Sequence, residues 1–101
     1  MSIGDDLERW LRAEAAERTK TAAGRRGNAQ TANATDADRK AAHKITEQML
    51  GRKVPKTTRA QDAESDAIQE RIAAKLDAEA AMITGFADWL RGLMDEQWSR
   101  V

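Results

Sequence analysis

The spacing of the large apolar side chains constrains the fold of this chain more than any other feature. From Arg12 to Lys44, a stretch of 33 positions, there is no Leu, Ile, Val, Met, Phe or Trp. A second gap runs from Pro55 to Ala67. The large side chains therefore form three clusters, at residues 3–11, 45–54 and 68–98, and eleven of them lie in the last.

These clusters provide little material for a core. Hydrophobic residues make up 41% of the 101 positions, but 20 of them are alanine. Burying one large apolar side chain contributes about 1.5–3 kcal/mol, whereas ordering about a hundred residues costs on the order of 100–200 kcal/mol. We therefore expect a thin core that a partner completes.

Composition predicts an all-α fold. Ala, Glu, Arg, Lys, Gln and Leu are abundant, there is one proline, and no window alternates apolar and polar residues as a strand would. We predict a single small domain over residues 1–101, a bundle of three or four helices at about 5–18, 36–50, 59–84 and 86–98. Residues 19–35 contain two glycines and no large apolar side chain, so they are predicted to form a flexible linker.

Local signals mark the helix ends. Thr35-x-x-Asp38 and Thr58-x-x-Gln61 resemble capping boxes, and Gly51 is placed to end the second helix. Gly85 favours a bend in the third helical stretch. Its apolar stripe, which includes Ile68, Ile72, Leu76, Ile83, Phe86, Leu90 and Leu93, is predicted to organise the core, with residues 3–11 and 45–50 packed on it.

Catalytic and metal-binding signatures are missing. Without cysteine there is no disulfide or thiolate metal site. His43 is the only histidine, and Glu47, four residues later, predicts a contact on the helix surface. We expect no enzyme activity, no catalytic residue, no cofactor, no metal and no small-molecule substrate. The acidic N-terminus and the short apolar runs argue against a signal peptide or a membrane span, so we expect a cytoplasmic protein.

A net charge of zero hides a strongly uneven distribution. Residues 18–59 carry eleven positive and three negative charges, whereas the segments on either side of them are acidic. This basic segment either pairs with the acidic third helix or is solvated, which we favour slightly, or it contacts phosphates of a nucleic acid. The candidate phosphate contacts are Arg25, Arg26, Arg39, Lys40, Lys44, Arg52 and Lys53.

The tryptophans predict a protein interface. They lie in the acidic ends rather than in the basic segment, and tryptophan is enriched at the centres of interfaces. The candidate interface residues are Trp10, Phe86, Trp89, Leu93 and Trp98. We therefore expect a non-enzymatic adaptor, inhibitor or assembly subunit, of a type found in phages and mobile elements. It would bind a protein partner or another copy through the apolar face of its C-terminal helix; a nucleic-acid-associated protein is the alternative.

Overall fold

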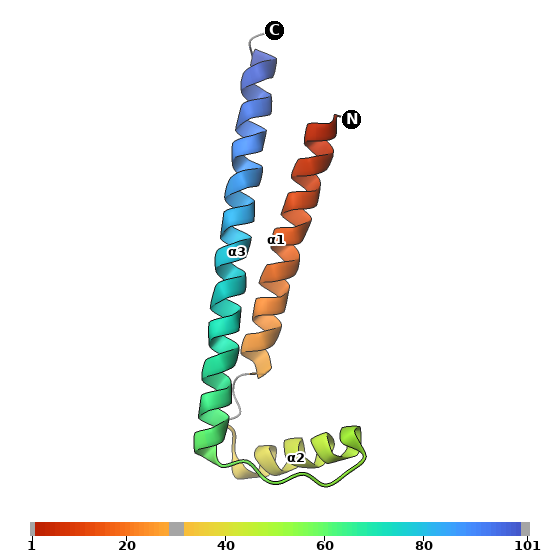
Figure 1. Ribbon diagram of the computed structural model, residues 1–101, viewed down its shortest axis with the longest axis vertical. Helices are drawn as coiled ribbons and strands as arrows, with labels where there is room; N and C mark the ends of the chain where they lie inside the picture. Colours follow the sequence, from red (N-terminus) through yellow and green to blue (C-terminus); the bar gives the residue numbers. More distant parts are fainter. Residues whose placement is uncertain (1, 29–31, 100–101) are drawn as a thin grey trace.

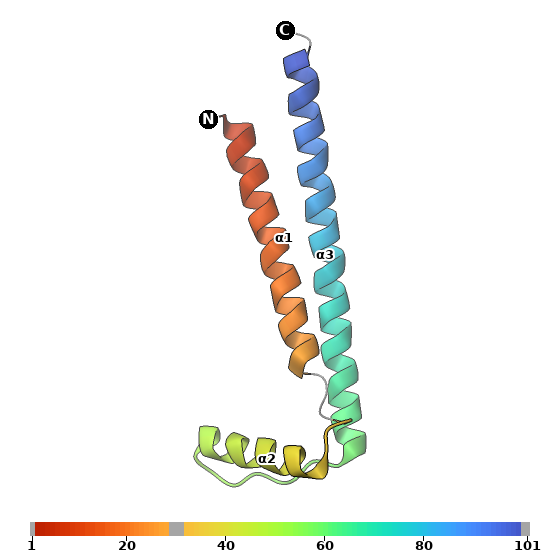
Figure 2. The same ribbon diagram turned by 180° about the vertical axis from the view of Figure 1, so that it is seen from behind.

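The chain folds into a helical hairpin with a third helix across one end. The computed structural model describes residues 2–28 and 32–99. They form three helices, α1 (Ile3–Asn28), α2 (Asp36–Leu50) and α3 (Arg59–Ser99), and no strand is found in this part of the chain. α1 and α3 run antiparallel, and α2 lies across the end where α1 finishes (Figures 1 and 2). The prediction of an all-α fold is confirmed, but the molecule is elongated, with extents of 67 × 25 × 16 Å.

α1 is ten residues longer than predicted at its C-terminal end, so the linker prediction is wrong for residues 19–28. These residues are helical because their small side chains fit against α3: Ala22 is fully buried. Arg25 and Arg26 also reach α3, where Arg25 donates to Gln69 at 3.1 Å. The predicted linker residues 29–31 lie outside the described part.

The turn at residues 32–35 is held against the start of α3. The Arg59 guanidinium donates to the backbone carbonyls of Ala32 and Ala34 at 2.8 and 3.0 Å. The backbone N–H of Ala32 donates to the carboxylate of Asp66 at 3.0 Å. This segment is therefore fixed by hydrogen bonds, contrary to the predicted flexibility.

α3 is one continuous helix of 41 residues, so the predicted bend at Gly85 is also wrong. At about 1.5 Å per residue it is about 60 Å long. It begins with the predicted capping box: Thr58 and Gln61 exchange two backbone-to-side-chain hydrogen bonds, at 2.9 and 3.1 Å. Since α1 packs along much of α3, interhelical contacts outweigh the cost of one glycine in a helix interior, about 1 kcal/mol.

α2 is well capped but hardly packed. The Thr35 hydroxyl accepts a hydrogen bond from Asp38 N–H at 3.2 Å, and Gly51 ends the helix in the left-handed region at φ 67°. None of its residues is buried. Ile45 and Met49 are 56% and 82% exposed, so the prediction that residues 45–50 pack on the third helix is wrong. Residues 3–11 do lie along α3, as part of α1.

The interface between α1 and α3 is built from small side chains. In α3 the buried apolar residues recur every seven positions, as Ala73, Ala80 and Ala87. α1 contributes a matching line of buried residues, Leu11, Ala15 and Ala22. A heptad spacing keeps one side of a helix against its partner, and alanine lets the two backbones approach closely. We call this interface the alanine seam.

Candidate protein-interaction surface

The alanine seam leaves the large apolar side chains outside. The predicted core stripe of α3 is not the buried one: Ile68, Ile72 and Phe86 are 43%, 36% and 48% exposed. Leu76, Ile83 and Leu90 are only partly covered. Thus the prediction that this stripe organises the core is wrong, because alanines occupy the positions that face α1.

The exposed apolar residues of both long helices lie on the same flank of the hairpin. The opposite flank is marked by cross-helix ion pairs from Arg12 to Asp88 and from Arg26 to Asp77. At about 100° per residue, Leu7 and Leu90 point to the other side of the seam from these pairs. The open end of the hairpin therefore carries a two-helix apolar flank, formed by Ile3, Leu7 and Trp10 of α1 and by Ile83, Phe86 and Leu90 of α3.

The structure places four of the five predicted interface residues on the hairpin surface. Trp10 and Trp89 are each 58% exposed, and Leu93 is 39% exposed. The rings of Phe86 and Trp89 pack against each other with centroids 5.4 Å apart. The side chain of Trp98 lies outside the described part. Together these residues form an exposed aromatic and aliphatic surface near the open end.

Ion pairs across the alanine seam engage part of the predicted basic segment. Arg26 binds Glu70 at 3.1 Å and also binds Asp77. Arg18 binds Glu79 at 3.3 Å. These contacts hold the C-terminal half of α1 against α3. The hydrogen bonds of Arg26, chiefly those to Glu70, raise the pKa of its guanidinium.

A second group of ion pairs fastens the N-terminal half of α1. Arg91 of α3 binds both Asp5 and Glu8. The pKa of Glu8 is lowered, first by its hydrogen bond from Arg12 and then by that from Arg91. The pKa of Asp5 is lowered by hydrogen bonds from Ser2, which caps α1, and from Arg91. Both carboxylates therefore favour the folded hairpin most strongly when they are ionised.

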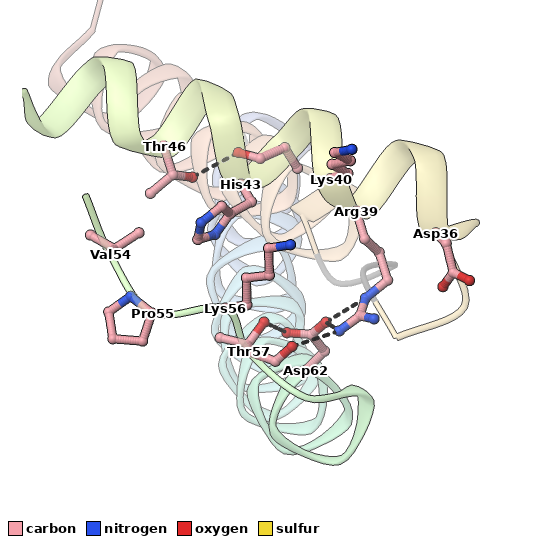
Figure 3. Close-up of a pocket in the computed structure, with 11 residues that line it drawn as sticks. Asp36, Arg39, Lys40, His43, Thr46, Val54, Pro55, Lys56, Thr57 and Asp62 are labelled. Atoms are coloured by element: carbon pink, nitrogen blue, oxygen red, sulfur yellow. Dashed lines mark hydrogen bonds and ion pairs between the residues drawn. The ribbon is translucent and has the colours of Figure 1, made fainter. Parts of the chain in front are cut away.

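The junction between α2 and α3 is organised around Asp62, a buried carboxylate. Its oxygens accept hydrogen bonds from the Thr57 hydroxyl at 2.6 Å and from the Arg39 guanidinium at 2.7 and 3.0 Å (Figure 3). These bonds lower the pKa of Asp62, with Thr57 the larger cause. Arg39, a predicted phosphate contact, is therefore engaged inside the protein.

A cavity of about 420 Å³ lies between α2 and the segment that leads into α3. His43, Lys40 and Lys56 line it beside the Arg39–Asp62 pair (Figure 3). His43 lies 3.2 Å from Glu47, which is the predicted helix-surface contact. Two of the side chains around the cavity thus contact carboxylates: Arg39 contacts Asp62, and His43 contacts Glu47.

The remaining candidate phosphate contacts are exposed. Lys40 and Lys44 lie on α2, and Arg52 and Lys53 lie just after it. Within residues 2–28 and 32–99, none of these four side chains has an ion-pair partner. The candidate phosphate contacts thus fall into two groups. Three arginines are bonded within the hairpin and its junction with α2, and four cations around α2 have no ion-pair partner in the described part of the chain.

Two further properties of the described residues concern metal ions and membranes. They contain no group of three or more His, Cys, Asp or Glu side chains placed to hold a metal ion. None of their helices is long and apolar enough to span a membrane.

Sequence reasoning missed the alanine seam itself. The signal was present, since Ala73, Ala80 and Ala87 repeat every seven residues. It was overlooked because a search for large apolar side chains treats alanine as neutral. Counting alanine as a core residue identifies the α1-facing side of α3, and it predicts that the larger residues face outward.

Comparisons with models of protein families, with curated proteins and with solved structures give no match for this chain.

Proposed function

We propose that this chain is a non-enzymatic interaction protein that binds a protein partner, or another copy of itself, through the apolar face of α3. The observation that carries the proposal is the exposure of large apolar side chains beside an alanine seam. Phe86, Trp89 and Leu93 are 48%, 58% and 39% exposed although α3 already packs along α1. Contiguous exposed apolar surface of this kind typically marks an interface.

The apolar flank adds to this argument. Trp10 and Leu7 extend the exposed surface from α3 onto α1, so a partner would contact two helices at once. The ion pairs on the opposite flank hold α1 and α3 together without using these side chains. A partner that covers them would supply the apolar burial that the alanine seam does not provide.

The test is a double substitution, Phe86→Ser with Trp89→Ser. Both side chains face away from the alanine seam, so the variant should keep its helical circular dichroism. We expect it to lose at least about tenfold in affinity for whichever protein the wild-type chain binds, because aromatic anchors dominate interface energies. The readout is capture of partners from native cell extract by the immobilised chain, together with sedimentation of the chain alone.

The matched control is Lys40→Ala with Lys44→Ala, which changes exposed residues of α2 and leaves the apolar face intact. This variant should bind as the wild type does. If the control loses all binding while the Phe86→Ser/Trp89→Ser variant retains it, the proposal is overturned.

One observation favours a second candidate function, contact with nucleic-acid phosphates. Lys40, Lys44, Arg52 and Lys53 are exposed around α2, and within the described part no carboxylate neutralises them. Binding of labelled DNA or RNA, followed by anisotropy over a salt series, tests this function. Each phosphate contact adds about 0.9 to the slope of log affinity against log salt for duplex DNA and about 0.7 for single strands.

A further inference from the structure

α3 carries a second line of residues with heptad spacing, outside the alanine seam. Steps of four and three residues connect Ile68, Ile72, Lys75, Glu79, Met82 and Phe86. The same spacing continues to Trp89 and Leu93. We call this line the outer seam. Spacing of this kind allows one helix to pair with another along its length.

The outer seam is open to a partner. Met82 is 74% exposed, and Ile68 and Ile72 are 43% and 36% exposed. In both views α1 and α2 lie on the same side of α3 (Figures 1 and 2). Lys75 is exposed and has no ion-pair partner among the described residues, whereas Glu79 is partly exposed and contacts Arg18 of its own chain at 3.3 Å through one carboxylate oxygen. A carboxylate can bind a second cation through its other oxygen.

We propose that the outer seam pairs with the outer seam of a second copy of this chain, antiparallel, with Lys75 of each copy opposite Glu79 of the other. This inference rests on the proposed function and names the partner that covers the apolar face. It gives a two-fold symmetric dimer, in which the same surface of both copies meets itself.

The sequence of the outer seam is symmetric about the point between Lys75 and Glu79. Ile72 lies three residues before Lys75, and Met82 lies three residues after Glu79. Four residues further out on each side are Ile68 and Phe86. Antiparallel pairing therefore brings apolar side chains against apolar side chains at every one of these steps, with two Lys–Glu pairs at the centre.

Other alignments of the two copies do not match apolar with apolar side chains and lysine with glutamate in this way. Sliding one copy by a heptad in either direction places Lys75 opposite Phe86 or opposite Ile72, which buries an unpaired charge. Parallel pairing in register places Lys75 beside Lys75 and Glu79 beside Glu79. A polar pair at the centre of a helical interface is a known means of fixing register and orientation.

The exposed area is sufficient for a stable pair. Six large apolar side chains per copy lie on the outer seam, with between 36% and 74% of their surface exposed. Since an aromatic side chain covers about 150–250 Å² when buried and an aliphatic one less, each exposed part contributes on the order of 100 Å². Trp89 and Leu93 lie opposite Ser65 and Gln61 of the other copy and are covered by that part of its helix. Twelve such side chains bring the dimer interface to about 1,000 Å², the lower bound for a specific interface.

The first test is charge reversal followed by sedimentation over a wide range of concentration. Lys75→Glu places carboxylate against carboxylate twice in each dimer, so its dissociation constant should rise at least about tenfold. A one-to-one mixture of Lys75→Glu and Glu79→Lys chains should dimerise again, since every central pair then regains opposite charges. Because Glu79→Lys also loses the bond to Arg18, its circular dichroism is first compared with that of the wild type. Lys20→Glu, the same change on the far surface of α1, is the matched control and should dimerise as the wild type does.

The second test measures the orientation of the two copies. Because the chain has no cysteine, Glu64→Cys introduces a unique site for a spin label beside the outer seam. In the proposed register the two labels are separated by twenty-six residues of helix, about 39 Å at 1.5 Å per residue. A parallel pair would bring them side by side.

Three results would overturn the inference. The wild-type chain could stay monomeric at every concentration, Lys75→Glu could leave the dimer as strong as before, or the spin labels of the two copies could lie side by side. The proposed function survives a monomeric result when the Phe86→Ser/Trp89→Ser variant still loses a different protein partner. If that variant keeps all of its binding, the proposed function fails as well.

Discussion

The hairpin and α2 are stabilised in opposite ways. α1 and α3 bury a line of alanines and are joined by ion pairs from Arg26 and Arg91. α2 buries none of its residues, and its order comes from Thr35 and Gly51 at its ends and from the bond of Arg39 to Asp62.

This difference shows what small side chains can and cannot do. Alanines allow close contact between helix backbones, so interhelical dispersion and ion pairs extend over much of the length of α1. They bury little apolar area, and the larger side chains remain on the outside. α2 has no buried residues, and its ion pairs, Arg39–Asp62 and Asp36–Arg59, lie only near its start, so we expect it to unfold locally before the hairpin does.

The largest effect should follow from overfilling the alanine seam. Ala80 is 6% exposed, and leucine at this position would force α1 and α3 apart. Ala80→Leu should therefore lower the free energy of unfolding by about 1–3 kcal/mol, as measured by urea unfolding. The same substitution at the exposed Ala81 is the control. Equal stability of the two variants would show that the helices do not pack through Ala80.

Smaller changes in stability should follow from two glycine substitutions, one at the end of α2 and one in the hairpin. Gly51 has φ 67°, where any other residue is strained, so Gly51→Ala should destabilise the end of α2 by about 1–2 kcal/mol. Gly85 is in the interior of the α3 sequence, and a Cβ added there would meet no atom within 4 Å. Gly85→Ala should therefore raise the free energy of unfolding of the hairpin by about 0.5–1 kcal/mol. Hydrogen exchange should show faster opening of α2 alone in the first variant. Loss of protection in α3 as well would mean that α2 and the hairpin unfold together.

The helix class and the helix ends could be predicted from sequence because they depend on local interactions. The capping boxes at Thr35 and Thr58 and the left-handed Gly51 require only a few neighbouring residues. The length of α1 could not be predicted locally. Its last ten residues are helical because α3 offers alanines and carboxylates to them, as at Ala22 and Arg26.

The exposure of the candidate surface has a cause that a search for large apolar side chains does not reveal. Phe86, Trp89 and Leu93 were predicted to be interface residues because the core looked too small. They are exposed because alanines occupy the α1-facing positions of α3. The basic segment could not be divided from sequence, since only the packed hairpin shows that Arg26 reaches Glu70 whereas Lys44 reaches no carboxylate in the described part.

The ion pairs across the alanine seam should contribute less than its packing. Arg26 is 40% exposed and Glu70 is 56% exposed, so solvent weakens their attraction. Arg26→Met should lower the urea midpoint by less than Ala80→Leu does, and the loss should shrink as salt is added. Lys20→Met, an exposed position on the same helix, is the control. A loss that does not depend on salt would mean that the Arg26 side chain acts through packing.

The smallest effect concerns the pH dependence of one carboxylate. Hydrogen bonds from Arg12 and Arg91 lower the pKa of Glu8 below its ordinary value of 4.5. A carboxylate with a lowered pKa stabilises the fold above its unfolded pKa, and this contribution is lost as the pH falls through the folded pKa. Glu8→Gln should therefore be less stable than the wild type near neutral pH, and the difference should vanish in acid. Glu17→Gln, on the exposed side of α1, should show no such change, and a difference between Glu8→Gln and wild type that persists in acid would assign the effect to shape rather than to charge.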